Sequence, residues 1–529
     1  MSIDLLTGPP SSTAPSPAPS PAPGDGPTAR SVSRDARRAR HRRAAVGAVH
    51  LLCFGIIAVV SRIAFLGNSI RLDEAQSLWQ TNHSYGALLE IVARDVHVPL
   101  YHVVLRTWRL ALGADIGTAR LLSLAFLLAC VPVFYLVARK VLTTRWALFA
   151  VVVFSCSPFL LWYGNEARMY SMLVFVTLVS QYFFLSVVTT DRALAWAGYA
   201  ASAVVGIYVH YFFVFVLVTQ GLFLLATWRR RPRGSVVRLL GVALVVAAAF
   251  APWFLYFRAN GSAGGTRPSL PSPSSIDYSN VYSQFVFGFQ SDAINTTVVS
   301  AWPLLVLAAL ASVRTGAKLD RASAYLVAAA FGPVLLAFAV SLLVTPFFLS
   351  RYMIAALPAF LVLVVRFLSG LTKPVAGVLA AGLLVATVAG TVVQAGNPAT
   401  PVREDYRTAA RIAEEARPQD LVVLSSPFTI YPFEYYYDGA ASVTTLPAWD
   451  RREVMPAFDP AQLPLDVESM AAGHQYVYLL LSYDQGYEEE VFQYFQQNFE
   501  RTASYEPSPG MRLLVYRVGY SEALPAGDG

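Results

Sequence analysis

Two adjacent carboxylates, Asp73 and Glu74, follow a long apolar run, in the stretch RLDEAQSLW at residues 71–79. Acids are costly inside a lipid bilayer and usually serve a function there, but at the membrane surface the cost is lower. One hypothesis is therefore a solvated helix start, where acidic residues are favoured. The other is chemistry, because a carboxylate beside the membrane is suited to act as a general base toward a hydroxyl group.

Further polar side chains stand between later apolar runs, in the stretches HVPLYH, YGNEARMYS, HYFF and SRYM. Each has a structural alternative: a histidine at an interface, a surface ion pair, or an arginine whose charged end reaches water. Together with the acid pair they form the candidate site residues, which we expect to bind a substrate or its phosphate: His97, His102, Glu166, Arg168, His210 and Arg351.

Acids, histidines and arginines at one membrane face suggest a site for a phosphorylated, lipid-borne substrate. Arginine is suited to gripping phosphate through its planar fork of donors. Histidine and carboxylate side chains also ligate divalent ions, so Glu74 and His97 are a candidate metal pair. Their spacing is not diagnostic, and a divalent ion is the only cofactor that we consider.

The elements that position these residues are expected to be membrane helices. The chain of 529 residues is 55% hydrophobic and only 14% charged, with a mean hydropathy of +0.49. Soluble proteins carry roughly 25% charged residues, so the composition indicates a polytopic membrane protein. The net charge of +7 lies largely in short clusters between apolar runs, where it sets topology and requires no nucleic acid.

Eleven apolar segments approach the roughly 20 residues that a spanning helix needs. The predicted fold is therefore mostly α, with about 11 transmembrane helices. The segments are 45–66, 118–138, 146–163, 169–188, 194–209, 211–228, 236–257, 297–313, 322–345, 351–369 and 374–394.

Basic clusters predict how these spans are oriented. With the arginine-rich segment at 34–43 in the cytoplasm, the strong clusters at 228–238 and 314–321 fall on the inner side. The candidate site residues then fall on the outer side, as does the chain after residue 395. We therefore expect a multi-pass protein of the plasma (inner) membrane with a cytoplasmic N-terminus and an extracytoplasmic C-terminal domain.

Three domains are predicted. Residues 1–44 form a Pro/Ala-rich and then Arg-rich cytoplasmic arm that we expect to be disordered. Residues 45–395 hold the spans, with an outer loop at 67–117 whose amphipathic segments lie along the membrane, and a long loop at 258–296 that resembles a flap. Residues 396–529 alternate helical periodicity with buried-strand runs and predict an α/β domain.

Four aromatic residues stand close together in the C-terminal domain: Phe433, Tyr435, Tyr436 and Tyr437. They are either a platform on which sugar rings stack or part of the domain core. The core is the assignment that we favour.

The polar motifs occur in an order that resembles a known family. LDEA is followed by HVPLYH, YGNEARMYS, HYFF and SRYMIAALP. In this order the chain resembles the GT-C type membrane glycosyltransferases of the glycosyltransferase family 39-like group, which includes protein O-mannosyltransferases and aminoarabinose transferases. The resemblance covers roughly residues 45–440. One departure is Val98, where the family pattern usually has proline.

This resemblance implies an integral-membrane enzyme that moves a sugar from a polyprenyl-phosphate donor to an acceptor hydroxyl, with inversion at the anomeric carbon. Asp73 matches the family's catalytic acid, which would deprotonate the acceptor, and Glu74 is its predicted catalytic neighbour. Glu74 and His97 match residues that shape the donor-phosphate site, and Arg351 would bind that phosphate. The donor sugar stays open, and so does the acceptor, which is a glycan, a glycolipid or a protein.

Two other functions compete with glycosyl transfer. A transporter places polar groups near the bilayer midplane, often within an internal repeat, whereas here they gather at one edge and no repeat is found. A membrane sensor or scaffold explains the outer domain but not the set of acids, histidines and arginines. Glycosyl transfer is therefore the favoured hypothesis.

Overall fold

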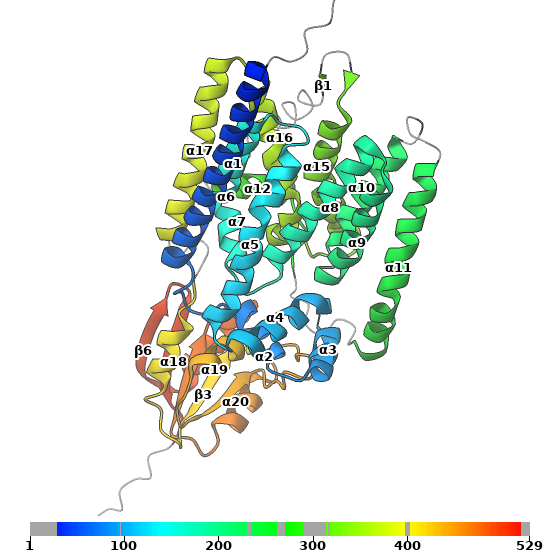
Figure 1. Ribbon diagram of the computed structural model, residues 1–529. Coiled ribbons are helices and arrows are strands. Elements are labelled where there is room, and N and C mark those ends of the chain that lie inside the picture. The colour runs from blue at the N-terminus through cyan, green and yellow to red at the C-terminus, as the bar shows by residue number, and fades with distance from the viewer. Residues whose placement is uncertain are drawn as a thin grey trace, which may run out of the picture. The chain divides into compact units, whose positions relative to one another are not determined.

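The computed structural model describes residues 29–95, 97–227, 229, 234–261, 270–289, 314–315, 318–396 and 403–519 (Figure 1). The chain divides into two compact units, Met1–Val49 and His50–Gly529. Helix α1 (Ala29–Ala64) runs from the first unit into the second. It begins inside the arm that we expected to be disordered, because arginine and alanine are good helix formers and continue directly into an apolar span. All contacts below lie within the second unit.

The described part of the chain is mostly helical, and seven helices are long and apolar enough to cross a membrane. An eighth span results if α6 (Thr144–Ser155) and α7 (Pro158–Gly164), which meet at 56°, count as one. The seven are Arg40–Ala64 of α1, α5 (Ile116–Ala138), α8 (Tyr170–Thr190), α11 (Gly234–Asn260), α15 (Arg321–Leu343), Ser350–Ser369 formed by η2 (Ser350–Ala356) and α16 (Leu357–Ser369), and α17 (Lys373–Gly396).

The predicted multi-pass helical architecture is confirmed, but the number of eleven spans is not. Each predicted span other than 297–313, which lies outside the described residues, coincides with helical structure. However, α9 (Ala193–Val209) and α10 (Phe213–Ala226) have only 17 and 14 residues, fewer than a straight crossing requires. The bend between α6 and α7 falls at Pro158, which cannot continue the hydrogen-bond ladder of α6.

Three short helices follow α1 where an outer loop was predicted: α2 (Leu72–Thr81), α3 (Tyr85–Arg94) and α4 (Pro99–Leu112). Each begins with a recognisable signal. Glu74 accepts a hydrogen bond from the backbone N–H of Arg71 ahead of α2, Ser84 caps α3, and Pro99 stands at the start of α4. Amphipathic helices were expected in this loop, and these helices carry part of the candidate site, including Asp73, Glu74 and His102.

The loop at 258–296 is not a plain flap. Residues Ser275–Phe287 form α12, which packs against α7 and α17. Tyr282 and Phe285 of α12 are buried, and the Ser157 hydroxyl donates to the Phe285 carbonyl. Burial of these aromatic rings stabilises the segment inside the bundle. Residues 262–269 and 290–296 of the loop lie outside the described residues.

The C-terminal domain is a five-stranded mixed sheet with helices, as predicted. The strand order is β4-β3-β5-β7-β6, with β3 parallel to β4 and β5, and β7 antiparallel to β5 and β6. Its elements are α18 (Tyr406–Ala413), β3 (Leu421–Ser425), η3 (Pro427–Thr429), α19 (Ile430–Tyr436), β4 (Ser442–Leu446), α20 (Leu463–Ala471), β5 (Tyr476–Leu481), α21 (Glu488–Asn498), β6 (Glu500–Ser508) and β7 (Met511–Arg517). A short hairpin of β1 (Arg314–Thr315) and β2 (Lys318–Leu319) precedes α15.

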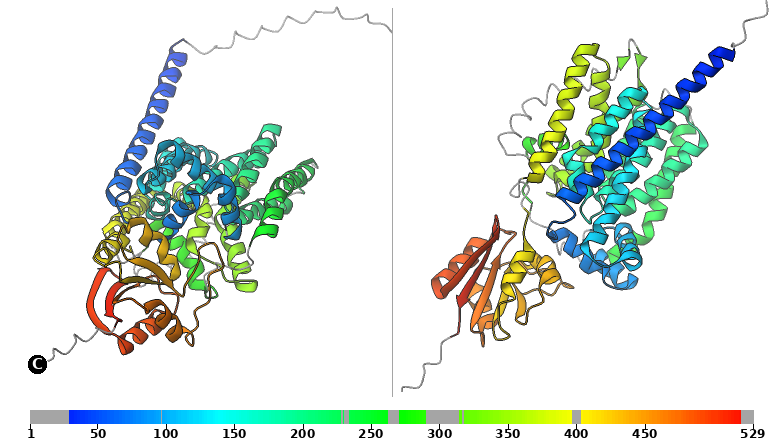
Figure 2. Two further views of the ribbon diagram at one scale, coloured as in Figure 1. Left: turned by 90° about the horizontal axis from the view of Figure 1, so that it is seen from below. Right: turned by 60° about the vertical axis from the view of Figure 1, so that its left-hand side comes forward.

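One face of this sheet packs against α20 and α21. Alternate residues of the strands, such as Leu421 and Val423, point to that face and meet Val467, Val491 and Phe495 of the helices. The two-residue period is that of a pleated strand. Figure 2 shows the sheet and its helices from two further sides.

Helix α19 joins the C-terminal domain to the helices around the candidate site. The Tyr436 hydroxyl accepts a hydrogen bond from the Ile70 N–H at 2.8 Å, and the Tyr435 hydroxyl accepts one from the Ile116 N–H at 3.0 Å. Phe433 is fully buried and stacks on Tyr437 within the domain. Two of these four aromatics therefore dock the domain, Phe433 belongs to its interior, and Tyr437 is half-buried.

Candidate active site

Asp73 is a partly exposed carboxylate surrounded by guanidinium groups. Its Oδ2 lies 3.3 Å from Arg351 Nη1, and its side chain is 27% exposed. Burial alone would raise the pKa of Asp73, but Arg351, Arg168 and Arg71 outweigh this effect and bring the pKa to about 2. Asp73 is therefore ionised at neutral pH, and part of it stays open to solvent or a ligand.

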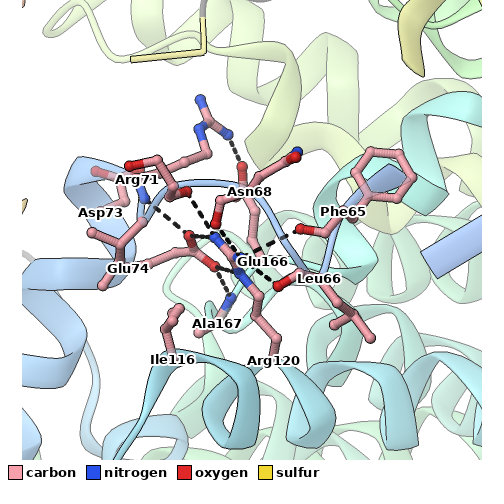
Figure 3. A network of polar contacts seen from close by, with 12 residues as sticks. Phe65, Leu66, Asn68, Arg71, Asp73, Glu74, Ile116, Arg120, Glu166 and Ala167 are labelled. Atoms are coloured by element: carbon pink, nitrogen blue, oxygen red, sulfur yellow. Dashed lines mark hydrogen bonds and ion pairs between the residues drawn. The ribbon is translucent and has the colours of Figure 1, made fainter. Parts of the chain in front are cut away.

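Glu74, by contrast, is fully buried and fully engaged. Its two oxygens accept from Arg120 at 2.9 and 2.6 Å, a bidentate pair, and also from the backbone N–H groups of Ala167 and Arg71. Arg120 reaches from α5 and donates in addition to carbonyl groups of the loop before α2, including that of Phe65 (Figure 3). Arg120 holds the pKa of Glu74 below its usual value although burial opposes this. This pair fixes the start of α2.

Glu166 and Arg168 do not form the surface ion pair that was the alternative hypothesis. Glu166 pairs with Arg71, and the Arg71 guanidinium lies over the Trp162 ring, 5.0 Å from its centroid. Arg403 covers the same ring at 5.3 Å. These residues, with Glu74 and Arg120, line a cavity of about 370 Å³ beside the start of α2.

Arg168 instead connects Asp73 to a histidine. Its Nη1 donates to the Asp73 carbonyl at 3.1 Å, and its Nη2 donates to His97 Nε2 at 2.7 Å. Because a guanidinium only donates, His97 Nε2 must accept, and the Nδ1–H then donates to Asp95 at 2.9 Å. Asp95 also accepts from Gln80 at 2.8 Å. These contacts form a continuous polar network. It runs from Asp73 at the start of α2 through Arg168, His97 and Asp95 to Gln80 near the end of α2.

The two remaining histidines lie at the edges of this network. The fully buried His102 ring stands 5.5 Å from that of His97, and its Nε2 has no hydrogen-bond partner among the described residues. Burial, with the nearby His97 and Arg168, lowers the pKa of His102 to about 3. His210 caps α9 and accepts from the Phe212 N–H, with its ring 5.6 Å from that of Tyr352. All eight candidate residues are thus brought to one region.

The candidate metal pair does not fit a metal ion. Both oxygens of Glu74 each accept two hydrogen bonds, and both ring nitrogens of His97 are engaged, one with Asp95 and one with Arg168. Neither residue has a lone pair to offer. Within the described ranges no group of three or more histidine, cysteine or acidic residues is arranged to hold a metal. A metal ion at Glu74 and His97 therefore stays an untested expectation, which these hydrogen bonds do not favour.

Three charged members of the network were missed by the sequence analysis: Arg71, Asp95 and Arg120. Arg120 could have been predicted from the sequence, because it stands inside a predicted span. An isolated charged residue in a span usually pairs with a group of opposite charge. Arg71 lies next to the acid pair but pairs with the distant Glu166. Asp95 showed no pattern in the sequence that would distinguish it from the other charges on amphipathic helices.

Comparison with known proteins agrees with this architecture. The sequence profile of the family described as "Dolichyl-phosphate-mannose-protein mannosyltransferase" matches residues 97–256, which is less than half of the chain. The structure of ArnT from Cupriavidus metallidurans in the apo state is similar, with a TM-score of 0.58 and 14% identity over 90% of this chain and 98% of ArnT. The chain has the GT-C fold.

Two further structures share this fold. ArnT bound to undecaprenyl phosphate gives a TM-score of 0.55 at 14% identity, over 90% of this chain and 99% of ArnT. The mycobacterial arabinofuranosyltransferase AftD gives 0.51 at 14% identity, over 91% of this chain but only 40% of AftD. No curated protein sequence matches the chain. The chain is a multi-pass membrane protein that resembles the protein mannosyltransferases and ArnT, and the fold and the matching profile support a glycosyltransferase.

Proposed function

We propose that this protein transfers a sugar from a polyprenyl-phosphate-linked donor to an acceptor hydroxyl at the outer face of the plasma membrane. The observation that carries the proposal is an ionised, partly exposed carboxylate, Asp73, held 3.3 Å from Arg351 at the end of a membrane span. When a hydroxyl attacks a sugar whose leaving group is a phosphate, the site needs a base to accept the hydroxyl proton and cations to stabilise the phosphate. The ArnT structure with undecaprenyl phosphate supports a donor of this class.

In the proposed reaction the acceptor oxygen forms a bond to the anomeric carbon while the bond from that carbon to the phosphate oxygen breaks. Asp73 accepts the proton of the acceptor hydroxyl. The leaving group is a phosphate monoester whose second pKa is about 6, so it departs as an anion that needs charge stabilisation more than protonation. A single displacement from the opposite face gives inversion.

Arg351 is the group that we assign to the departing phosphate. Its Nη1 faces Asp73, and its Nε has no hydrogen-bond partner within the described residues. A buried guanidinium donor without a partner is favourably satisfied by a phosphate oxygen. The lipid tail of the donor would lie in the bilayer, where each buried CH₂ contributes about 0.8 kcal/mol.

The other candidate residues receive supporting roles. We propose Glu74 as a positioning residue, not a reacting one, because all its oxygens are occupied by Arg120 and backbone donors. His97 and Arg168 hold the Asp73 segment through the chain described above, and Glu166 is the counter-charge of Arg71. His102 and His210 remain candidates for substrate binding on the strength of their ring contacts.

The proposal is tested with purified protein in detergent or nanodiscs, a panel of labelled polyprenyl-phosphate sugars, and glycan, glycolipid and peptide acceptors. One donor should be consumed by the wild type, with release of polyprenyl phosphate. Asp73→Asn should lose at least about a hundredfold in kcat while retaining donor binding. Consumption of none of the donors, or full activity of Asp73→Asn, would contradict the proposal. A transporter would move substrate without releasing polyprenyl phosphate.

A further inference from the structure

A second cavity, of about 670 Å³, lies on another side of α2 from the cavity that Glu74 and Arg120 line. Its wall comes from α2, α3, the end of α11 and the C-terminal domain, which contributes Tyr431 and the segment Trp449–Val454. The volume falls within the 300–1,000 Å³ that is typical of small-molecule sites. None of the eight candidate residues lines it.

Aromatic rings from two domains form one wall of this cavity. The Trp79 ring lies 5.4 Å from that of Tyr431, and Tyr431 lies 6.0 Å from Trp449. The Trp449 Nε1–H donates to the Glu453 carbonyl at 3.0 Å, which fixes the orientation of the indole. Sugar rings have an apolar face of C–H groups and a rim of hydroxyls, and the C–H face packs on the electron-rich face of an indole.

A buried polar group in the wall of the same cavity lacks a hydrogen-bond partner among the described residues. Gln80 lines the cavity and is only 1% exposed, yet its Oε1 accepts no hydrogen bond from the described residues. Its Nε2 donates to Asp95, which also accepts from Gln76 at 3.1 Å. An unpaired buried acceptor is costly. A hydroxyl group of a ligand is a suitable donor for it.

The charges around the cavity are balanced, which favours a neutral ligand. Three arginines and three acids line it, and several pair within the protein. Arg94 pairs with Glu90 at 2.5 Å and Arg451 with Glu434 at 2.7 Å. Asp95 is engaged by His97 at 2.9 Å. A phosphate or uronate ligand would find no excess of positive charge here.

The cavity stands close to Asp73 along the same helix. Gln76 and Gln80 follow Asp73 by three and seven residues in α2, so the three side chains share one helix face. With a rise of 1.5 Å per residue, Gln76 is about 5 Å and Gln80 about 10 Å further along the axis. A chain of sugar units in the cavity would therefore have one end within reach of Asp73.

We propose that this cavity binds the acceptor, and that the acceptor is a neutral, polyhydroxylated glycan. The C-terminal domain then contributes directly to acceptor recognition through Trp449 and Tyr431. This inference rests on the proposed transferase function, which supplies the need for an acceptor near Asp73.

The test measures glycan binding directly, without donor, by calorimetry on the purified full-length protein. The probes are neutral linear trisaccharides of mannose, galactose, glucose and arabinose, with trigalacturonate as the charged counterpart. At least one neutral trisaccharide should bind at least tenfold more tightly than trigalacturonate. Trp449→Ala should weaken its binding tenfold or more and Trp449→Phe less than threefold, while Tyr505→Ala, an exposed aromatic of the same domain outside the cavity, should have no effect.

Binding of no neutral trisaccharide, or equal binding by the wild type and Trp449→Ala, would overturn the inference. Transfer assays separate it from the proposed function. If the wild type consumes a polyprenyl-phosphate sugar and Trp449→Ala leaves the acceptor KM unchanged, the acceptor site is wrong and the transferase stands. If a neutral glycan binds at Trp449 but no donor is consumed, the glycan site stands and the transferase proposal fails.

Discussion

Arg351 and Asp73, which are far apart in the sequence, meet at 3.3 Å between Nη1 and Oδ2. Arg351 comes from the 3₁₀ turn η2 and Asp73 from the first turn of α2. In our proposal, the cation that neutralises Asp73 in the free protein also receives the phosphate of the donor. The pair is thus the point where acceptor activation and donor binding meet in our proposal.

Replacing Arg351 tests this relationship. We expect Arg351→Ala to lower kcat/KM for the donor by about 10²–10³-fold, the usual loss when one charge-stabilising donor is removed. Arg351→Lys should recover only part of it, because lysine keeps the charge but not the planar fork. Steady-state kinetics with varied donor measures the effect. Arg517→Ala, a surface arginine of β7, is the matched control, and a change of less than threefold for Arg351→Ala would argue against a phosphate role.

The buried pair of Glu74 and Arg120 should matter for stability. Their side chains are 0% and 4% exposed, and removing one partner of such a pair leaves an uncompensated buried charge that costs about 3–5 kcal/mol. We expect Glu74→Ala to lower the thermal unfolding midpoint clearly, and the combined Glu74→Leu and Arg120→Met variant to recover part of the loss. The exposed pair of Glu500 and Arg517 is the control, since Glu500→Ala should leave the midpoint unchanged. Equal midpoints for Glu74→Ala and wild type would show that the pair does not fix α2.

The sequence alone was sufficient to predict the membrane helices and the polar edge. An apolar run of about 20 residues can satisfy its backbone in a bilayer by forming a helix. The buried-strand run DLVVLSS likewise predicted β3, whose five residues are all buried. The helix at Ser275–Phe287 was missed because its Ser, Tyr and Asn residues conceal the apolar face. Only its packing against α7 and α17 reveals that face.

Partners within the site were less predictable than its members. Glu166 and Arg168 are two residues apart in an apparent ion pair, yet each takes a distant partner, Arg71 and His97. Such choices depend on tertiary distances that no local pattern encodes. The sequence likewise did not show that the two adjacent acids differ in their surroundings. Asp73 is partly exposed, whereas Glu74 is fully buried.

His102 predicts how stability depends on pH. Its pKa is about 3 in the folded protein against about 6.5 when unfolded. Above pH 6.5 it contributes no pH dependence. As the pH falls below 6.5, His102 binds a proton in the unfolded state but stays neutral in the folded state. The free energy of unfolding therefore falls by up to about 1.4 kcal/mol per pH unit. His102→Gln should therefore show a shallower fall of the unfolding midpoint between pH 7 and pH 5.

The control for this measurement is His474→Gln, a histidine of the C-terminal domain that bonds the Gln419 carbonyl. That variant should keep the wild-type slope. If His102→Gln and the wild type lose stability in parallel on acidification, His102 is not the buried neutral group that its surroundings indicate.

The orientation in the membrane can be tested with single cysteines, because the natural Cys53, Cys130 and Cys156 are buried and give a low background. Gly86 in α3 is exposed, with open space where a side chain would stand. Ala193 at the start of α9 is also exposed and lies between the predicted spans 169–188 and 194–209, at the end that the predicted orientation places inside. In intact cells a membrane-impermeant maleimide should label Gly86→Cys and not Ala193→Cys, and permeabilisation should expose both. Labelling of Ala193→Cys alone in intact cells would place α2 and Asp73 in the cytoplasm. That result would contradict a transferase that acts at the outer face of the membrane.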